Sequence, residues 1–208
     1  MILEACVETR EEAILAERLG ASRLELCANL SEGGITPELP LLKKILQEVS
    51  IPVKVMIRPQ GGDFIYSEAD TRLMLNSIRR FREYPISGFV FGALTRNREL
   101  DLKLIKKLVE AAAPLDVTIH RAIDLTPDPS ESAYYLSSVK GVTAILTSGG
   151  AETALEGADM IRSMIPNAGK KINVIAAGKI TNSNLAAVRA ATGVNEFHGR
   201  RIVGELTW

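Results

Sequence analysis

Short segments rich in aliphatic residues alternate with longer segments of helical character along the whole chain. Strand followed by helix, repeated about eight times without a change of composition, is typical of a parallel α/β fold. The longer segments predict helices at about 9–19, 38–49, 68–83, 101–113, 129–139, 157–165 and 182–191. The short segments predict strands at 2–7, 23–27, 53–58, 88–92, 116–120, 143–147, 172–177 and 195–198.

Eight strand–helix units in one chain favour a closed barrel over an open sheet. The chain has 208 residues, which is short for a fold that usually needs about 250. The sequence also ends soon after His198, the last residue of the final predicted strand. We therefore expect one domain over residues 1–208, an α/β (β/α)₈ TIM barrel whose eighth helix is short or missing.

The charge balance and the apolar runs exclude several classes of protein. Lys plus Arg and Asp plus Glu both number 25, whereas a general nucleic-acid-binding protein would show a basic excess. The longest apolar runs are too short to cross a bilayer, and the N-terminus has no signal-peptide pattern. The two cysteines, Cys6 and Cys27, are then expected to be free thiols in a reducing compartment. We expect a cytoplasmic protein with no nucleic-acid and no membrane partner.

Alternation along the predicted strands assigns many polar side chains to the barrel interior. Apolar residues at alternate positions, such as Leu24 and Leu26, must pack outward under the helices, and their neighbours then point inward. Buried charges without partners cost several kcal/mol each. The interior therefore holds either a salt-bridge network, in which Lys54 and Arg58 neutralise Glu4 and Glu25, or a functional site. The inward set is Glu4, Cys6, Glu25, Cys27, Lys54, Met56, Arg58, Thr118, His120, Thr147, Asn173, Glu196 and His198.

The loops that follow the strands carry further candidate residues. The segment "RPQGGDFIY" (58–66) would place Arg58 and Asp63 at the mouth of the barrel. In "HRAID" (120–124), His120 lies near a carboxylate and could act as a base, an acid or a metal ligand. The glycine-rich turns "TSGG" (147–150) and "AAGKIT" (176–181) can cradle an anion, although such turns also use glycine for backbone reasons alone.

Six stretches of the sequence match the motifs of a known family. They are "RLELCANLSEGGITP" (23–37), "VMIRPQGGDFIYS" (55–67), "FGALT" (91–95), "VTIHRAID" (117–124), "LTSGGAETALEG" (146–157) and "NEFH" (195–198). In these stretches the chain resembles the copper homeostasis protein CutC family. The resemblance implies a (β/α)₈ barrel, a cytoplasmic homo-oligomer, and a role in copper homeostasis with copper binding. The chain departs from the family pattern at Gln60, at Ile119 and Ile123, at Lys179, and in its largely absent C-terminal helix.

The first function that these residues favour is the binding of copper. Cu(I) prefers thiolate and thioether ligands, and Cys6 and Cys27 lie on neighbouring strands about 4.8 Å apart, so they could share one copper ion with Met56 as a third ligand.

The alternative is an isomerase, lyase or hydrolase that acts on a small anionic or sugar-like molecule, and a ligand-binding barrel without turnover is a third reading. The catalytic candidates are Glu25, Arg58, His120, Arg121 and Asp124, and the substrate-binding candidates are Asp63, Thr147, Ser148, Gly149, Gly178 and His198.

Overall fold

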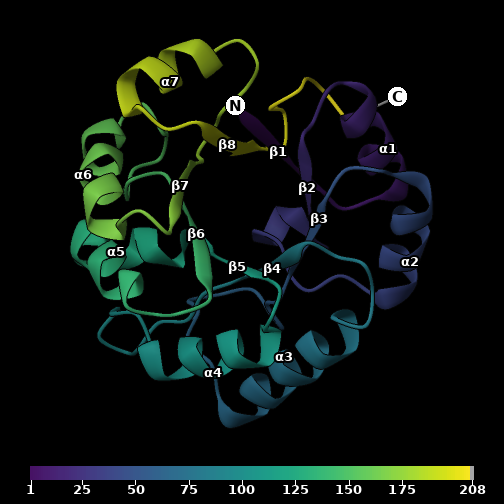
Figure 1. Ribbon diagram of the computed structural model, residues 1–208, viewed down its shortest axis with the longest axis horizontal. Helices are drawn as coiled ribbons and strands as arrows, with labels where there is room; N and C mark the ends of the chain where they lie inside the picture. Colours follow the sequence, from purple (N-terminus) through teal and green to yellow (C-terminus); the bar gives the residue numbers. More distant parts are fainter. Residues whose placement is uncertain (207–208) are drawn as a thin grey trace.

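Eight parallel strands close into a barrel in chain order, with helices arranged around the outside (Figure 1). The computed structural model describes residues 1–206. Residues Ile2–Val7 (β1) pair with Arg23–Leu26 (β2) on one side and with Glu196–Gly199 (β8) on the other, which closes the barrel. The remaining strands are Val53–Met56 (β3), Gly88–Phe91 (β4), Asp116–Ile119 (β5), Val142–Thr147 (β6) and Asn173–Ala176 (β7).

Seven α-helices connect these strands, and their ends have clear local causes. The side chain of Thr9 accepts the Glu12 N–H at the start of the first helix, and Asp128 accepts two backbone N–H groups at the start of the fifth. The helices are Arg10–Arg18 (α1), Leu39–Glu48 (α2), Glu68–Phe81 (α3), Leu102–Ala112 (α4), Pro129–Ser137 (α5), Ala158–Ala168 (α6) and Leu185–Thr192 (α7), with short 3₁₀ turns at Leu30–Glu32 and Arg121–Leu125.

The predicted (β/α)₈ barrel is confirmed, and β8 closes it against β1. No helix follows β8 within residues 200–206. Instead, this segment buries Ile202 and Leu206 in the main core, and in Figure 1 it runs close to α1. None of the helices in the described part of the chain is both long and apolar enough to cross a membrane.

The main core lies between the strands and the helices, and the barrel interior holds separate, smaller apolar clusters. One interior cluster joins Cys6, Cys27, Met56 and Val90. A second joins Ala144, Leu146, Ile175 and Ala177, all from β6, β7 and the residue after β7. The interior is therefore polar along the strands that carry the predicted charged residues and apolar along β6 and β7.

The prediction that Thr147 points inward is wrong. Ala144 and Leu146 occupy the inner phase of β6, so Thr147 points outward, where its hydroxyl lies 3.7 Å from the sulfur of Met164 on α6. On this strand Val142, Ala144 and Leu146 alternate with Thr143, Ile145 and Thr147. The rule that the apolar phase packs outward fails here, because Ala144 and Leu146 line the interior. Asn173 shares the inner phase of β7 with Ile175, but it is exposed at the start of that strand.

Candidate metal and ligand site

The lower interior of the barrel is a salt-bridge network centred on Glu4. One oxygen of this fully buried carboxylate contacts the Arg23 guanidinium, and the other lies 2.9 Å from Nδ1 of His198. Arg23 also binds Glu196 at 2.9 Å. Burial disfavours the ionised carboxylate, but His198, Arg23 and Lys54 outweigh it and lower the pKa of Glu4 to about 2.

The network uses different partners from those predicted. Lys54 Nζ donates to Thr118 Oγ1 at 2.7 Å, and the charge of Glu4 is balanced mainly by Arg23 and His198. Sequence reasoning overlooked Arg23, although it lies two residues before Glu25 and so shares its inward phase.

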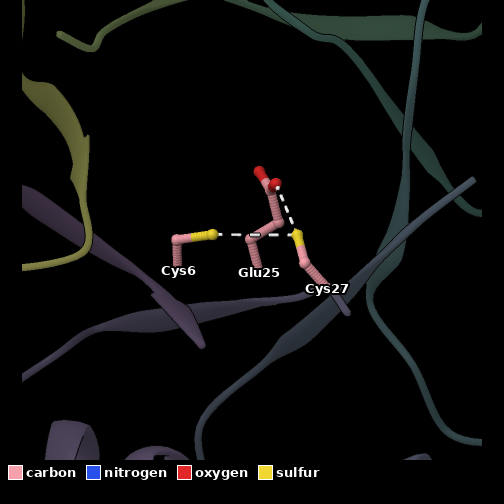
Figure 2. Close-up of side chains that lie close together, drawn as sticks. All are labelled: Cys6, Glu25 and Cys27. Carbon is pink, nitrogen blue, oxygen red and sulfur yellow. Dashed lines mark hydrogen bonds between the residues drawn. The ribbon is translucent and has the colours of Figure 1, made fainter. Parts of the chain in front are cut away.

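Two free thiols and a carboxyl group lie next to this network, further along β1 and β2. Figure 2 shows that they face one another: Cys6 Sγ on β1 is 3.7 Å from Cys27 Sγ, which follows β2, and Cys27 Sγ is 3.3 Å from Glu25 Oε1. All three side chains are buried, and both cysteines are unbridged. The ligand atoms of these three residues lie within 4.8 Å of one another, which is close enough to hold one metal ion.

The thiols differ in their ease of ionisation. The hydrogen bond from Cys27 lowers the pKa of the Cys6 thiol to about 6, although burial opposes this. The same contact, together with burial, raises the pKa of Cys27 well above its usual value. Near neutral pH the pair is therefore a thiolate at Cys6 and a thiol at Cys27.

The groups around the thiols also have displaced pKa values. Burial raises the pKa of Glu25 to about 8, and the negative charges of Cys6 and Glu4 add to this effect. Burial alone would lower the pKa of His198, but Glu25, Cys6 and Glu4 raise it well above its usual value. His198 is therefore an imidazolium that faces two carboxyl groups and a thiolate.

The thiols form part of the wall of a cavity of about 290 Å³ at the carboxyl ends of the strands. A larger groove of about 520 Å³ lies at the amino-terminal ends of β5 and β6, and none of the predicted site residues lines it. The smaller cavity brings together eight of the predicted residues, which are Cys6, Glu25, Cys27, Met56, His120, Arg121, Gly178 and His198.

His120 presents a fixed, neutral imidazole to this cavity. Its Nδ1 accepts the Ala122 N–H at 3.2 Å, and its ring lies 4.7 Å from the ring of Phe64. Burial, reinforced by the nearby charge of Arg58, lowers the pKa of His120 to about 3. Because Nδ1 is an acceptor, the single ring proton is on Nε2.

Arg58, a catalytic candidate from the sequence, does not line the cavity. Its guanidinium donates to the carbonyl oxygens of Glu32, Gly34 and Gly62 at 3.0–3.1 Å and lies 4.5 Å above the Phe64 ring. Arg58 therefore ties together the loops after β2 and β3. Asp63 lies at the exposed tip of the second of these loops, where it accepts the Ile65 N–H.

Asp124 also lacks a free face toward the cavity. It accepts the backbone N–H groups of Ser148 and Gly150 at 3.0–3.2 Å, the hydroxyls of Thr147 and Ser148, and Nε of Arg121 at 2.8 Å. These contacts hold the turn after β6 in place. Asp124, Thr147 and Ser148 thus form a structural unit, and only Arg121 of this group reaches the cavity.

Gly149 is required by the backbone of the same turn. Its N–H binds Thr147 Oγ1 at 2.8 Å, and a Cβ at this position would lie 2.3 Å from the carbonyl oxygen of Gly157. Its φ of +71° also favours glycine. The contacts therefore account for Gly149 without a bound anion, whereas Gly178 lies in the cavity wall.

The whole chain can be compared with known proteins. It matches the sequence profile of the CutC family over residues 1–203. The chain belongs to the CutC family. A human relative, the copper homeostasis protein cutC homolog, is 44% identical over 197 residues, which are 95% of this chain and 72% of that protein. A CutC family protein of Mesorhizobium japonicum is 42% identical over 95% of this chain and 76% of its own length.

Solved structures agree with this membership. A crystal structure of CutC from Streptococcus agalactiae superposes on this CutC family chain with a TM-score of 0.91 at 33% identity, covering 97% of this chain and 99% of that one. Phosphoenolpyruvate phosphomutase from Streptomyces platensis reaches a TM-score of 0.62 at 14% identity, covering 95% and 75%. The second similarity shows the barrel fold alone.

Proposed function

We propose that this CutC family chain takes part in copper homeostasis by binding one Cu(I) ion between Cys6 and Cys27. The observation that carries the proposal is the 3.7 Å separation of two buried, unbridged sulfur atoms beside a cavity. Thiolates are the donors that Cu(I) prefers. Relatives that carry the name copper homeostasis protein support the same role.

The sulfur–sulfur separation indicates the geometry of such a site. With a metal–thiolate bond of about 2.3 Å, two sulfurs on opposite sides of a linear ion would be about 4.6 Å apart, and at a tetrahedral angle about 3.8 Å apart. The observed 3.7 Å therefore fits a bent pair with room for a third donor. Met56 lines the same cavity and Glu25 lies beside Cys27, so a thioether or a carboxylate can complete the site.

The experiment is a competition between the purified, reduced protein and a coloured Cu(I) chelator under anaerobic conditions. We expect one Cu(I) per chain, and a loss of affinity of about a hundredfold or more, ~2.7 kcal/mol, in Cys6→Ser and in Cys27→Ser. Met56→Leu keeps the volume and both thiolates, and it should still bind one Cu(I). Wild-type affinity in the double variant Cys6→Ser/Cys27→Ser would remove the thiolate site.

We further propose that residues 1–208 act as one domain, in the cytoplasm and as a homo-oligomer. The pairing of β1 with β8 joins the two ends of the chain, which supports one domain. A reducing compartment would keep both thiols available for Cu(I). Tyr134 and Tyr135 are exposed on α5, where a second copy could cover them. A solution mass equal to one chain would contradict the assembly.

A further inference from the structure

One buried hydrogen-bond donor at the mouth of the barrel has no partner. His120 is 4% exposed, and within residues 1–206 nothing accepts a hydrogen bond from its Nε2. Buried N–H groups are nearly always paired, because an unpaired one loses its hydration without compensation. Since His120 lies in the wall of the 290 Å³ cavity, a ligand there can supply the absent acceptor.

The surrounding residues prevent this imidazole from turning toward another partner. The Ala122 N–H holds Nδ1, and the Phe64 ring packs against the imidazole. On another side, a Cβ at Gly92 would lie 2.7 Å from Nδ1, so only glycine leaves room for the ring. The donor is thus held rigidly in place, which is the arrangement expected of a binding group.

The charges around the cavity favour an anion. Arg121, Lys179 and Arg200 line it together with the imidazolium of His198. The opposing groups in the wall are the Cys6 thiolate and the carboxyl group of Glu25. The acidic partners of the two arginines and the lysine, among them Asp124 and Glu152, do not line the cavity. Lys179 also has a φ of +52°, a conformation that residues other than glycine rarely adopt.

The cavity also limits the size of the ligand and offers it a second polar contact. A volume of about 290 Å³ accommodates about ten groups of the size of water, at about 30 Å³ each. Oε2 of Glu25 has no hydrogen-bond partner in the described chain, so it can contact a hydroxyl of the ligand. Met56, Leu146 and Ala177 provide apolar wall between these polar groups.

We propose that the mouth of the barrel binds a small organic anion with a carbonyl oxygen that accepts the hydrogen bond of His120 Nε2. Its carboxylate or phosphate group lies among Arg121, Lys179 and Arg200. This site is additional to the thiol pair and does not require copper. The chain then binds two chemically different ligands, a metal ion and an organic anion.

Nuclear magnetic resonance of ¹⁵N-histidine protein tests the proposal, because the chain has two histidines. The metal-free protein is titrated with pyruvate and with dihydroxyacetone phosphate, and then with lactate, glycerol 3-phosphate and inorganic phosphate. We expect a saturable shift of the His120 Nε2–H signal with at least one of the two carbonyl compounds, with Kd below about 1 mM. The matching alcohol should bind about tenfold or more weakly.

Variants separate this site from the copper site. Lys179→Gly removes a rim charge at a positive φ and should weaken binding severalfold, whereas the exposed Glu152→Gln should leave it equal or stronger. Cys6→Ser/Cys27→Ser removes the thiolate charge from the cavity wall, so it should bind the anion equally or more tightly while Cu(I) affinity is lost. Loss of both would tie the anion to the thiols. No His120 shift with either carbonyl compound up to about 10 mM, or equal binding of inorganic phosphate, would overturn the proposal.

Discussion

Nδ1 of His198 lies 2.9 Å from one carboxylate oxygen of Glu4, at the seam where β8 meets β1. The other oxygen of Glu4 contacts Arg23 on β2, so one buried carboxylate links three strands. The pairing also keeps His198 protonated beneath the thiols. The stability of the barrel seam and the positive charge of His198 next to Cys6 therefore both depend on Glu4.

Glu4→Gln is expected to destabilise the protein strongly. The change removes the buried carboxylate that Arg23 and His198 share, so that Arg23 keeps only Glu196. Breaking such a buried pair typically costs about 3–5 kcal/mol. Urea unfolding followed by circular dichroism measures this loss. Glu11→Gln is the control, because Glu11 is exposed and pairs only at the surface, and it should change stability by less than about 0.5 kcal/mol. A wild-type urea midpoint for Glu4→Gln would contradict the network.

Gly92→Ala is expected to disturb the His120 imidazole. The new Cβ would lie 2.7 Å from Nδ1, so the ring must move, at a cost of about 1–3 kcal/mol in the free energy of unfolding. In Gly61→Ala the new Cβ would meet Glu32 at 3.5 Å, an ordinary contact, so this variant is the matched control. Thermal unfolding of both variants checks the prediction, and equal midpoints would show that the imidazole is not confined.

Asp124→Asn is expected to destabilise the turn after β6, because Asp124, a catalytic candidate from the sequence, holds that turn in place. The carboxylate accepts two backbone N–H groups, two hydroxyls and an arginine. Charge-assisted hydrogen bonds are worth about 1.5–3 kcal/mol each, so stability should fall by at least about 2 kcal/mol. Chemical denaturation measures the loss. Asp63→Asn, at an exposed loop tip, should be nearly neutral, and equal behaviour of the two variants would refute this role of Asp124.

The pH dependence of stability tests the neutral state of His120. Its pKa is about 3 in the folded protein, against the ordinary 6.5, so between these values the unfolded chain binds the extra proton. This contribution to stability is present above pH 6.5 and declines as the pH falls. The expected loss from this group between pH 7 and pH 5 is about 2 kcal/mol.

A non-titrating variant isolates that contribution. The pKa of Glu25 is raised, so its contribution to stability grows as the pH falls from 7 to 5. The pKa of His198 is also raised, and its stabilising contribution is fully present below pH 6.5. The wild type is therefore compared with His120→Asn, which keeps an acceptor for Ala122, by urea unfolding at both pH values. The same pH dependence in the two proteins would mean that His120 does not resist protonation.

The sequence predicts the barrel and the inward-pointing residues of β1 and β2 for a simple physical reason. Strands with apolar residues at every second position, such as β1 and β2, reveal which side chains point inward, and Cys6, Glu25 and Cys27 follow directly. On β6 the same rule fails, because Ala144 and Leu146 of the apolar phase face the interior, whereas Thr147 faces α6.

The loop residues were harder to predict, because their partners depend on backbone conformation. Arg58 donates to carbonyl oxygens of two loops, and Asp124 accepts N–H groups of a third loop. No periodicity encodes such contacts. The orphaned Nε2 of His120 likewise follows from packing by Phe64 and Gly92, which only the folded chain brings together.

X-ray absorption at the copper edge of the wild-type protein, loaded anaerobically with one Cu(I), tests the central claim most directly. We expect sulfur scatterers from Cys6 and Cys27 at an ordinary metal–thiolate distance of about 2.3 Å, and their loss from the spectrum of Cys6→Ser/Cys27→Ser. A first shell made only of nitrogen and oxygen in the wild type, or a sulfur shell unchanged in the double variant, would contradict a copper site at the thiol pair.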